Sequence, residues 1–451
     1  MLTLLNTARS IGIWGFGIVG KSLLKYLTPH NYRLGLLDKR QLSQEEQEYL
    51  ATHTVSFFDQ SRLEEFLSSH DIIIPSPGID VRLYHTYAHK FISEVDIFFD
   101  ALRTMPIKPQ VIGITGTLGK TTITYLLTTI LQNNHKKAAA LGNIGTAMLD
   151  ACPTLSELDV AVIELSSFQL EHAHAVAPDL AIWTNLYPKH LDRHDTLEEY
   201  FNAKYSLIKN QSATQQALVP WELAEKIYSY NPRIQLNFFS EQFPENYTQL
   251  KPTHALYYYD AQGQCVKYLD GLHTPLILPA RQSSKSDGWE PVEGCSGVLN
   301  NAFNLTYPIN WLIITAALDC LGYTTISLHP ETLHLPEHRL ELVAIVNNIH
   351  FYNDSKSTMM VATQAAVDKL RNQNHHKKII LLLGGVSDGG DRRPHSSTKT
   401  IASTEILETL EQLKKAQKES YNQLDNITSK QQTFYQKKLS NEVVVSHTIN
   451  N

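Results

Sequence analysis

Apolar and polar positions alternate along this chain with two different periods. Short apolar runs that end at glycine, proline or a charged residue indicate buried strands, and they begin at Ser10 and Val111 and recur at 32–37, 158–164, 180–185 and 378–385. Apolar residues spaced three or four apart indicate helices at 121–132, 197–209 and 310–322. Because strands and helices take turns along the chain, the pattern predicts an α/β fold with mostly parallel sheets.

One strand-to-helix junction carries residues typical of a phosphate-binding loop. After the β-branched run from Val111 come Gly116 and Gly119, and then Lys120 and Thr121 at the start of the helical pattern. Glycines let backbone N–H groups approach a polyphosphate, the helix N-terminus favours anions, lysine neutralises charge, and the threonine hydroxyl can bind Mg²⁺. The stretch therefore predicts a nucleotide site.

The match to the phosphate-loop pattern G-x-x-x-x-G-K-[ST] is imperfect. Ile114 stands where the first glycine is expected, and Gly113 and Gly116 flank it. The alternative is an ordinary glycine-rich strand-turn-helix. Gly-Lys-Thr directly at the helix start favours the nucleotide site.

A second glycine-rich junction lies near the N-terminus. Gly15, Gly17 and Gly20 follow the first strand and open a helical pattern, and the strand at 32–37 ends on Asp38. This order predicts a Rossmann-like βαβ unit in which the acidic residue bonds a ribose or uridine group. The pattern 71–79 predicts a further strand that ends in a Pro/Gly loop at the same sheet edge.

Polar residues at strand ends suggest further site residues. Glu164 ends the strand at 158–164, where an acidic residue in a phosphate-loop fold commonly serves Mg²⁺, although such a residue is also often a solvated boundary. A cluster that contains His190 follows the strand at 180–185. Lys204 lies within the helix at 197–209, and on its own it would be a solvated helix charge.

Composition narrows the class of protein. The chain has 451 residues, with 42% hydrophobic and 19% charged residues and a net charge of −6. This balance gives no basic surface for nucleic acid. Four cysteines without C-x-x-C spacing argue against a disulfide framework or zinc site. With no signal-peptide pattern and no apolar run of membrane-spanning length, we expect a cytoplasmic protein. We also expect a monomer.

The length predicts about three domains. We place a Rossmann-like nucleotide-binding domain at 1–105, a central phosphate-loop domain at 106–329, and a smaller C-terminal α/β domain at 330–451. The stretch 282–297 is expected to be an insertion loop. The polar sequence after about residue 392 predicts a divergent or disordered tail.

Taken together, these motifs resemble the Mur ligases of bacterial cell-wall synthesis over about residues 10–390. The segment Glu164-Leu-Ser-Ser-Phe-Gln-Leu-Glu171 is similar to the D-glutamate-adding branch of that family. The resemblance implies ATP-driven amide formation through an acyl phosphate, with a UDP-sugar, an amino acid and ATP as substrates. It also implies one or two Mg²⁺ ions.

The resemblance further implies roles for individual residues. The UDP-sugar would contact Ile18, Val19, Asp38, Arg40, Ser76, Gly78 and Asn143. ATP would contact Gly116, Gly119, Lys120, Thr121, Thr122, Asn310, Arg339, Asp354 and Lys356, and D-glutamate would contact Thr358. Lys120, Glu164, His190 and Lys204 would be catalytic; the metal ligands would be Thr121, Glu164, His190 and Lys204, the last as a carbamylated lysine.

The chain departs from the family pattern at several places. Lys189 stands where an aspartate usually precedes the histidine that matches His190, and Thr306 and Tyr307 replace a His-Asn pair near the adenine. Asp388 stands where a lysine usually meets the D-glutamate carboxylate, and no closing Leu-Ser-Pro segment precedes Asn451. We therefore expect weakened binding of the amino acid.

Three alternatives to an active D-glutamate-adding ligase follow. The chain could be a binding or regulatory relative that keeps the UDP-sugar and ATP sites but has lost acceptor chemistry. It could be a sibling ligase for another amino acid, such as the folylpolyglutamate type. A Rossmann dehydrogenase would leave the phosphate loop unexplained.

Overall fold

The computed structural model describes residues 5, 8–230, 234–245, 247, 255–276, 306–323, 325–328, 332–346, 349–357, 359–373, 379, 381–385 and 446–449. The chain divides into two units, Met1–His334 and Leu335–Asn451. None of the described helices is long and apolar enough to cross a membrane.

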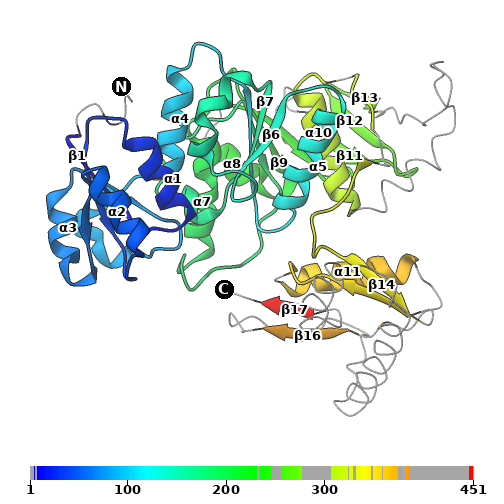
Figure 1. Cartoon of the computed structure of the whole chain (residues 1–451). Coiled ribbons are helices and arrows are strands. Elements are labelled where there is room, and N and C mark those ends of the chain that lie inside the picture. Colours follow the sequence, from blue (N-terminus) through cyan, green and yellow to red (C-terminus); the bar gives the residue numbers. More distant parts are fainter. Residues whose placement is uncertain are drawn as a thin grey trace. The chain divides into compact units, whose positions relative to one another are not determined.

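The first unit begins with a four-stranded parallel sheet in the order β3-β2-β1-β4 (Figure 1). Its strands are β1 (Ser10–Trp14), β2 (Arg33–Leu37), β3 (Ser56–Phe58) and β4 (Ile72–Pro75). The helices α1 (Ile18–Leu27), α2 (Gln44–Thr52) and α3 (Leu63–Ser69) alternate with them. Strand β1 is buried along its whole length, as expected for an inner parallel strand.

Helix α4 (Glu94–Thr104) leads from the first sheet to the second. Ser93 caps its N-terminus in a capping box with Asp96. The helix is buried from Glu94 to Leu102, so it is a packed element between the two sheets and not an exposed linker.

A nine-stranded sheet forms the centre of the first unit, in the order β13-β12-β11-β10-β9-β8-β5-β7-β6. Its strands are β5 (Gln110–Thr115), β6 (Ala138–Gly142), β7 (Val160–Glu164), β8 (Leu180–Trp183), β9 (Gln216–Pro220), β10 (Gln235–Phe239), β11 (Leu256–Tyr259), β12 (Cys265–Leu269) and β13 (Leu272–Pro275). The pairs from β6 to β11 are parallel, and β12 and β13 add an antiparallel edge. The carboxyl ends of β5, β7 and β8 are therefore neighbours.

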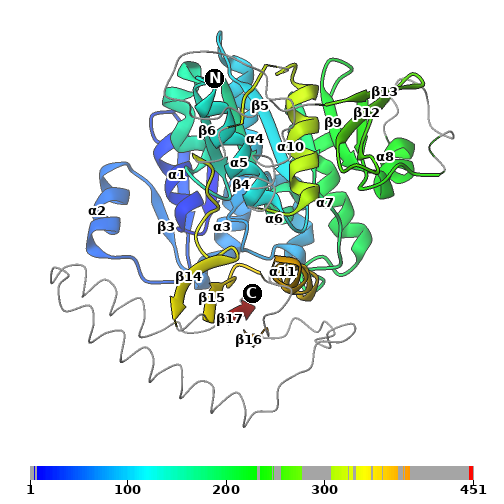
Figure 2. The ribbon, with the colours of Figure 1, turned by 90° about the vertical axis from the view of Figure 1, so that its right-hand side faces the viewer.

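Helices cover the central sheet on both faces. They are α5 (Lys120–Asn133), α6 (Ser167–Leu170), α7 (Leu197–Lys209), α8 (Ala224–Tyr230) and α10 (Pro308–Cys320). Figure 2 shows α5 and α10 side by side against the sheet. Helix α10 is buried from Asn310 to Leu318, which explains its almost uniformly apolar sequence.

The second unit contains an antiparallel hairpin, β14 (Glu341–Val346) and β15 (Ile349–Asn353), with an irregularity between Leu342 and Ala344. Helix α11 (Met360–Gln373) follows, and β16 (Leu382–Gly385) pairs in parallel with β17 (Ser446–Ile449).

The α/β class with mostly parallel sheets is confirmed. The helix at 197–209 is observed with those bounds, and the other strands and helices named from the pattern are observed with ends shifted by a few residues. The expected insertion at 282–297 lies outside the described residues, as does the tail after residue 392 except for β17.

Candidate functional site

The phosphate-type loop connects β5 to α5 and is held by backbone conformations that suit glycine. Gly116 has φ +142° and Gly119, the residue before α5, has φ +84°. A Cβ atom on Gly116 would come within 1.9 Å of Thr184 Oγ1. Ile114 still belongs to β5, paired with Glu164 on one side and Ile182 on the other. The strand therefore runs past the position where the motif expects its first glycine.

The end of β8 holds this loop in place, which the sequence pattern did not predict. Asn185 Oδ1 accepts hydrogen bonds from the backbone N–H groups of Thr117 (3.2 Å) and Leu118 (2.8 Å). The Thr184 hydroxyl donates to Leu118 O. The only sequence signal was that both residues end the strand at 180–185.

Two lysine side chains converge on one carbonyl oxygen of the loop. Lys120 Nζ donates to Gly116 O at 2.9 Å and to Thr117 O at 3.1 Å. Lys204 Nζ, on α7, donates to the same Gly116 O at 2.8 Å and is almost completely buried. Burial, together with the nearby Lys120 and Lys189, lowers the pKa of Lys204 well below its usual range.

The carboxylate of Glu164 lies at the end of β7, next to the loop strand, and is only half satisfied. Asn143 Nδ2 donates to Glu164 Oε1 at 2.8 Å, and Asn143 N donates to the backbone oxygen of Glu164 at 2.9 Å. Glu164 Oε2 is buried and has no hydrogen-bond partner among the described residues. A buried carboxylate oxygen without a partner is costly, so this atom is a natural ligand for a cation.

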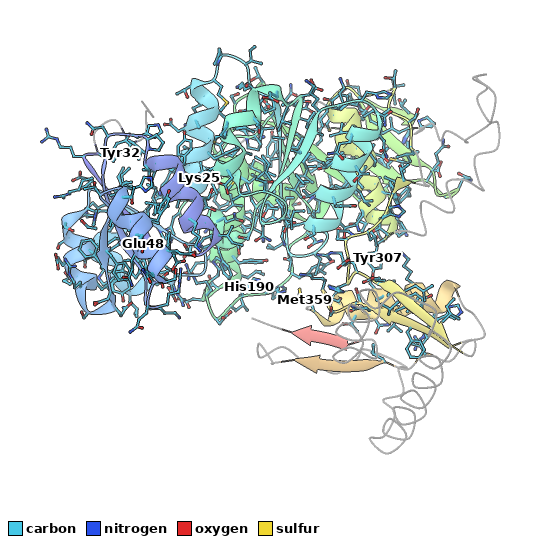
Figure 3. The ribbon with its side chains drawn as sticks, in the orientation of Figure 1. Lys25, Tyr32, Glu48, His190, Tyr307 and Met359 are labelled. Atoms are coloured by element: carbon cyan, nitrogen blue, oxygen red, sulfur yellow. The ribbon has the colours of Figure 1, made fainter. Side chains whose placement is uncertain are left out.

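His190 lies on the loop after β8 and is half-buried (Figure 3). Its ring packs against Phe168 with a centroid distance of 4.9 Å, and its φ is +57°. Burial, followed by the charges of Lys189, Lys204 and Lys120, lowers the pKa of His190 to about 4. The ring is therefore neutral near pH 7, the form in which a histidine can bind a metal.

Asn310, on α10, reaches the same loop. A Cβ atom on Gly119 would come within 3.0 Å of Asn310 Oδ1. Asn310 Nδ2 donates to the hydroxyl of Thr306 at 2.7 Å, so the threonine that departs from the family pattern orients this amide.

The described residues provide only part of a metal site. No three His, Cys, Asp or Glu side chains gather to hold a metal within the described ranges. Mg²⁺, however, usually takes one or two carboxylates together with substrate phosphates and water. The free oxygen of Glu164 beside a phosphate-type loop fits that smaller donor set.

The glycine turn and the 76–78 loop lie at the carboxyl ends of β1 and β4. Helix α1 begins at Ile18 after the glycine turn, with Ile18 exposed and Val19 half-buried. Gly20 is required by close approach, because a Cβ there would come within 1.9 Å of Gly15 O. The Ser76 hydroxyl donates to the same Gly15 O at 3.3 Å, which joins the 76–78 loop to the turn.

Asp38 and Arg40 brace the glycine turn. Asp38 Oδ2 accepts from Phe16 N at 2.6 Å, and its Oδ1 accepts from Arg40 N at 2.9 Å. Arg40 donates to Phe16 O and to both carboxylate oxygens of Glu46. These bonds lower the pKa of Glu46 to about 2, with Arg40 as the largest cause and Lys21 the next. Glu46 is a further residue at this site that the sequence pattern did not single out.

In the second unit, three of the expected nucleotide-contacting residues lie on two adjacent segments. Asp354 Oδ1 accepts from Leu340 N at 2.9 Å, and Lys356 N donates to His338 O at 3.2 Å. Arg339 lies between these contacts, where His338 (φ +68°) and Leu340 (φ +46°) have left-handed backbone. Thr358 and Asp388 lie outside the described residues.

Two protein-family models match consecutive stretches of the chain. Residues 10–82 match the MurD N-terminal domain, and residues 114–261 match the Mur ligase middle domain. The first match contains the glycine turn with Asp38 and Arg40, and the second contains Lys120, Glu164, His190 and Lys204.

Curated relatives carry the name UDP-N-acetylmuramoylalanine–D-glutamate ligase. The protein from Protochlamydia amoebophila is 28% identical over 400 residues, which cover 84% of this chain and 77% of that protein. The one from Alkaliphilus oremlandii is 28% identical and covers 78% and 73%. The one from Chloroherpeton thalassium is 33% identical, over 58% of this chain and 55% of that protein.

Solved structures of similar chains include MurF from Acinetobacter baumannii, with TM-score 0.44, 15% identity and coverage of 83% of this chain and 73% of that one. The ligase MurC from Thermotoga maritima has TM-score 0.41, 15% identity and coverage of 83% and 80%. The assignment does not rest on these distant likenesses. It rests on the two matched domain families and the curated relatives, by which this chain carries a MurD N-terminal domain at 10–82 and a Mur ligase middle domain at 114–261.

Proposed function

We propose that this chain is an ATP-dependent amide ligase that joins D-glutamate to UDP-N-acetylmuramoyl-L-alanine, a step in peptidoglycan precursor synthesis. The names of the curated relatives and the match to the MurD N-terminal domain support this choice of substrates.

The observation that carries the proposal is the arrangement at the carboxyl edge of the central sheet. A phosphate-type loop lies beside Glu164, whose free oxygen is buried, and two lysines converge on the loop carbonyl of Gly116. Positive charge and a free carboxylate together suit a nucleotide triphosphate with a bound cation.

The chemistry follows from the poor reactivity of a carboxylate. The alanyl carboxylate oxygen attacks the γ-phosphorus of ATP, ADP leaves, and an acyl phosphate forms. The amine of D-glutamate then attacks the acyl carbon, phosphate leaves with the carboxylate oxygen, and the nitrogen loses a proton. Lys120 and the N-terminus of α5 hold the phosphates during the first step.

Thr121, Glu164 and His190 would hold Mg²⁺, which supplies charge neutralisation at the transferred phosphoryl group. Lys204 would complete the set as a carbamate. Its environment supports that modification, because a buried ammonium group that shares an acceptor with Lys120 suffers like-charge repulsion. Converting the amine to a carbamate replaces this repulsion by attraction.

The ligand contacts of the remaining residues are proposed from their positions in the motifs that resemble the family. Ile18, Val19, Asp38, Arg40, Ser76, Gly78 and Asn143 would contact the UDP-sugar, and Gly116, Gly119, Thr122, Asn310, Arg339, Asp354 and Lys356 would contact ATP. Thr358 would contact D-glutamate. Two alternatives stay open, a relative that binds both ligands without turnover and a sibling ligase for another amino acid.

Omission of single substrates tests the proposal. With ATP, Mg²⁺ and UDP-N-acetylmuramoyl-L-alanine, phosphate release is expected to rise when D-glutamate is added. An increase with a different amino acid but not with D-glutamate would favour the sibling ligase. Binding of both ligands with no phosphate release would favour the non-catalytic relative.

A further inference from the structure

We propose that Arg193 and Arg82 form an arginine clamp that ties the loop carrying His190 to the 76–82 segment of the first sheet, and that this clamp couples the UDP-sugar site to the nucleotide site. The two arginines are positioning residues, and the inference rests on the proposed function of the two sites.

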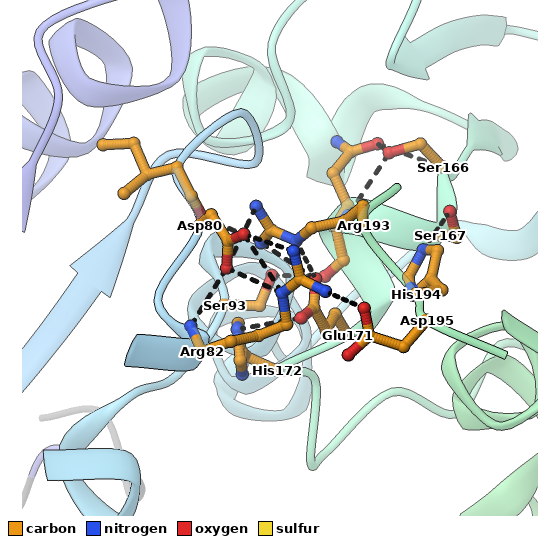
Figure 4. A network of polar contacts seen from close by, with 12 residues as sticks. Asp80, Arg82, Ser93, Ser166, Ser167, Glu171, His172, Arg193, His194 and Asp195 are labelled. Carbon is orange, nitrogen blue, oxygen red and sulfur yellow. Dashed lines mark hydrogen bonds and ion pairs between the residues drawn. The ribbon is translucent and has the colours of Figure 1, made fainter. Parts of the chain in front are cut away.

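Arg193 joins three segments that are distant in sequence (Figure 4). Its guanidinium donates to Glu171 Oε2 through Nε (3.1 Å) and NH2 (2.9 Å), and NH2 also donates to Ile79 O at 2.8 Å. The side chain is almost completely buried. It therefore connects the His190 loop to the end of α6 and to the residue that follows the 76–78 loop.

Arg82, on the segment that follows β4, contacts the same loop. It pairs with Asp80 on its own segment, and it donates to Asp195 and to Asp192 O on the loop. Asp80 also lies 4.0 Å from Arg193 NH1, so the two arginines share one acidic neighbour. The loop is thus fixed at three closely spaced points, Asp192, Arg193 and Asp195.

The loop needs external contacts because its backbone is strained. His190 (φ +57°) and Asp195 (φ +40°) both have left-handed conformations that non-glycine residues rarely adopt. Phe168 provides the inner support: its ring lies 4.9 Å from His190 and 5.5 Å from His194, and the Arg193 guanidinium lies 5.6 Å from its centroid. The position of His190 therefore depends on where Arg193 is held.

Coupling follows from these shared contacts. A ligand that orders the 76–78 loop also orders Ile79 and Asp80, and through the clamp it favours the His190 loop in its bound position. A nucleotide that uses His190 favours the same arrangement from the other side. Each ligand should then raise the affinity of the other by the same factor, because binding linkage is reciprocal.

The experiment measures that factor by calorimetry. The probes are UDP-N-acetylmuramoyl-L-alanine and the Mg²⁺ complex of β,γ-imido-ATP, each titrated alone and in the presence of the other. The unaltered full chain is expected to show a coupling factor of about 5 or more. Arg82→Met should reduce it to about one third, since exposed ion pairs contribute modestly, while each separate affinity changes by less than about twofold.

Arg62→Met is the matched control. Arg62 also makes a bidentate pair with a carboxylate, Glu65, and also donates to a backbone oxygen, Phe57 O, within the first sheet domain. It touches no residue of the clamp, so the coupling factor should be unchanged in this variant.

Arg193→Lys is the second variant. Lysine keeps the charge opposite Glu171 but cannot also make the forked contact that reaches Ile79 O. It should lower the coupling factor further than Arg82→Met and reduce kcat more than it raises the KM for the UDP-sugar.

The outcomes separate the clamp from the proposed function. Independent binding of the two probes to the unaltered chain, or full coupling in Arg82→Met, would overturn the clamp and leave the proposed function standing. Failure of the unaltered chain to bind either probe would overturn the proposed function itself, and the clamp with it.

Discussion

Lys120 and Lys204 direct their ammonium groups at the same oxygen atom, Gly116 O, although they lie 84 residues apart on α5 and α7. At the scale of the residue, this shared acceptor is the most informative feature of the site. Two cations are placed where a polyphosphate and a metal-binding anion are proposed. The following substitutions separate their roles.

Lys120→Ala should lower substrate-dependent phosphate release by about 100-fold or more, because it removes the cation that neutralises the phosphates. The melting temperature should change little, since Lys120 is only partly buried and its Nζ donates to two carbonyl oxygens of its own loop, Gly116 O and Thr117 O. Lys25→Ala, at an exposed lysine paired with Asp150, is the control. Unchanged ATP turnover in Lys120→Ala would remove this lysine from the mechanism.

Lys204→Ala should lose activity, and formate or acetate should partly restore it if a carbamate normally stands there. In the unaltered chain, intact mass measured in bicarbonate should show an adduct that the variant lacks. Lys209→Ala, at an exposed lysine of the same helix, should retain both activity and adduct. A fully active Lys204→Ala chain would contradict the assignment.

Asp388→Lys should improve saturation by D-glutamate, because an acidic residue at this position repels a dicarboxylate. A lost charged contact costs about 2–5 kcal/mol, or roughly 30-fold to several thousand-fold in affinity. The measurement is the D-glutamate concentration dependence of phosphate release. Tight saturation in the unaltered chain, unharmed by the substitution, would show that another residue makes this contact.

At the scale of the element, α4 and α6 meet through a small buried polar cluster. Gln169 Nε2 donates to Glu94 Oε1 at 3.1 Å, and the Ser93 hydroxyl donates to Gln169 O at 2.7 Å. Because this serine has only one hydroxyl proton, its 3.2 Å contact with Glu94 Oε2 is best made by a protonated Glu94. Burial, the largest cause, raises the pKa of Glu94 to about 7.

Because of this cluster, we expect the stability of the folded chain to fall as pH rises. In the folded chain Glu94 keeps its proton up to about pH 7, whereas in the unfolded chain it loses that proton near the ordinary glutamate pKa of 4.5. The free energy of unfolding therefore falls as pH rises through that window, by about 3 kcal/mol.

Denaturant unfolding of the unaltered chain and of Glu94→Gln, each at pH 5 and pH 8, measures the contribution of Glu94 to this pH dependence. From pH 5 to pH 8, the free energy of unfolding of the variant should rise by about 2–3 kcal/mol relative to that of the unaltered chain. Glu65→Gln, at an exposed acid whose pKa is lowered by Arg62, should show no such gain. A pH-independent difference for Glu94→Gln would mean that Glu94 is ionised in the folded chain.

At the scale of the whole molecule, local patterns predicted the elements and the residues at strand ends. Lys120 and Glu164 were found because a phosphate loop and a strand-terminal acid have short sequence signatures. Asn185 and Glu46 were missed because they act across space on a neighbouring loop or turn, and nothing adjacent in sequence marks that contact. The Arg193 contact with Ile79 depends on the packing of two sheets, which periodicity does not encode.

The central claim is that an alanyl carboxylate is phosphorylated by ATP before D-glutamate arrives. It is tested most directly with UDP-N-acetylmuramoyl-L-alanine in which both carboxylate oxygens are ¹⁸O, incubated with ATP, Mg²⁺ and D-glutamate, followed by mass analysis of the released phosphate. The account predicts one ¹⁸O atom in each phosphate, because the carboxylate oxygen leaves with it. Phosphate that carries no ¹⁸O would show that water attacks ATP instead, and would contradict the ligase mechanism.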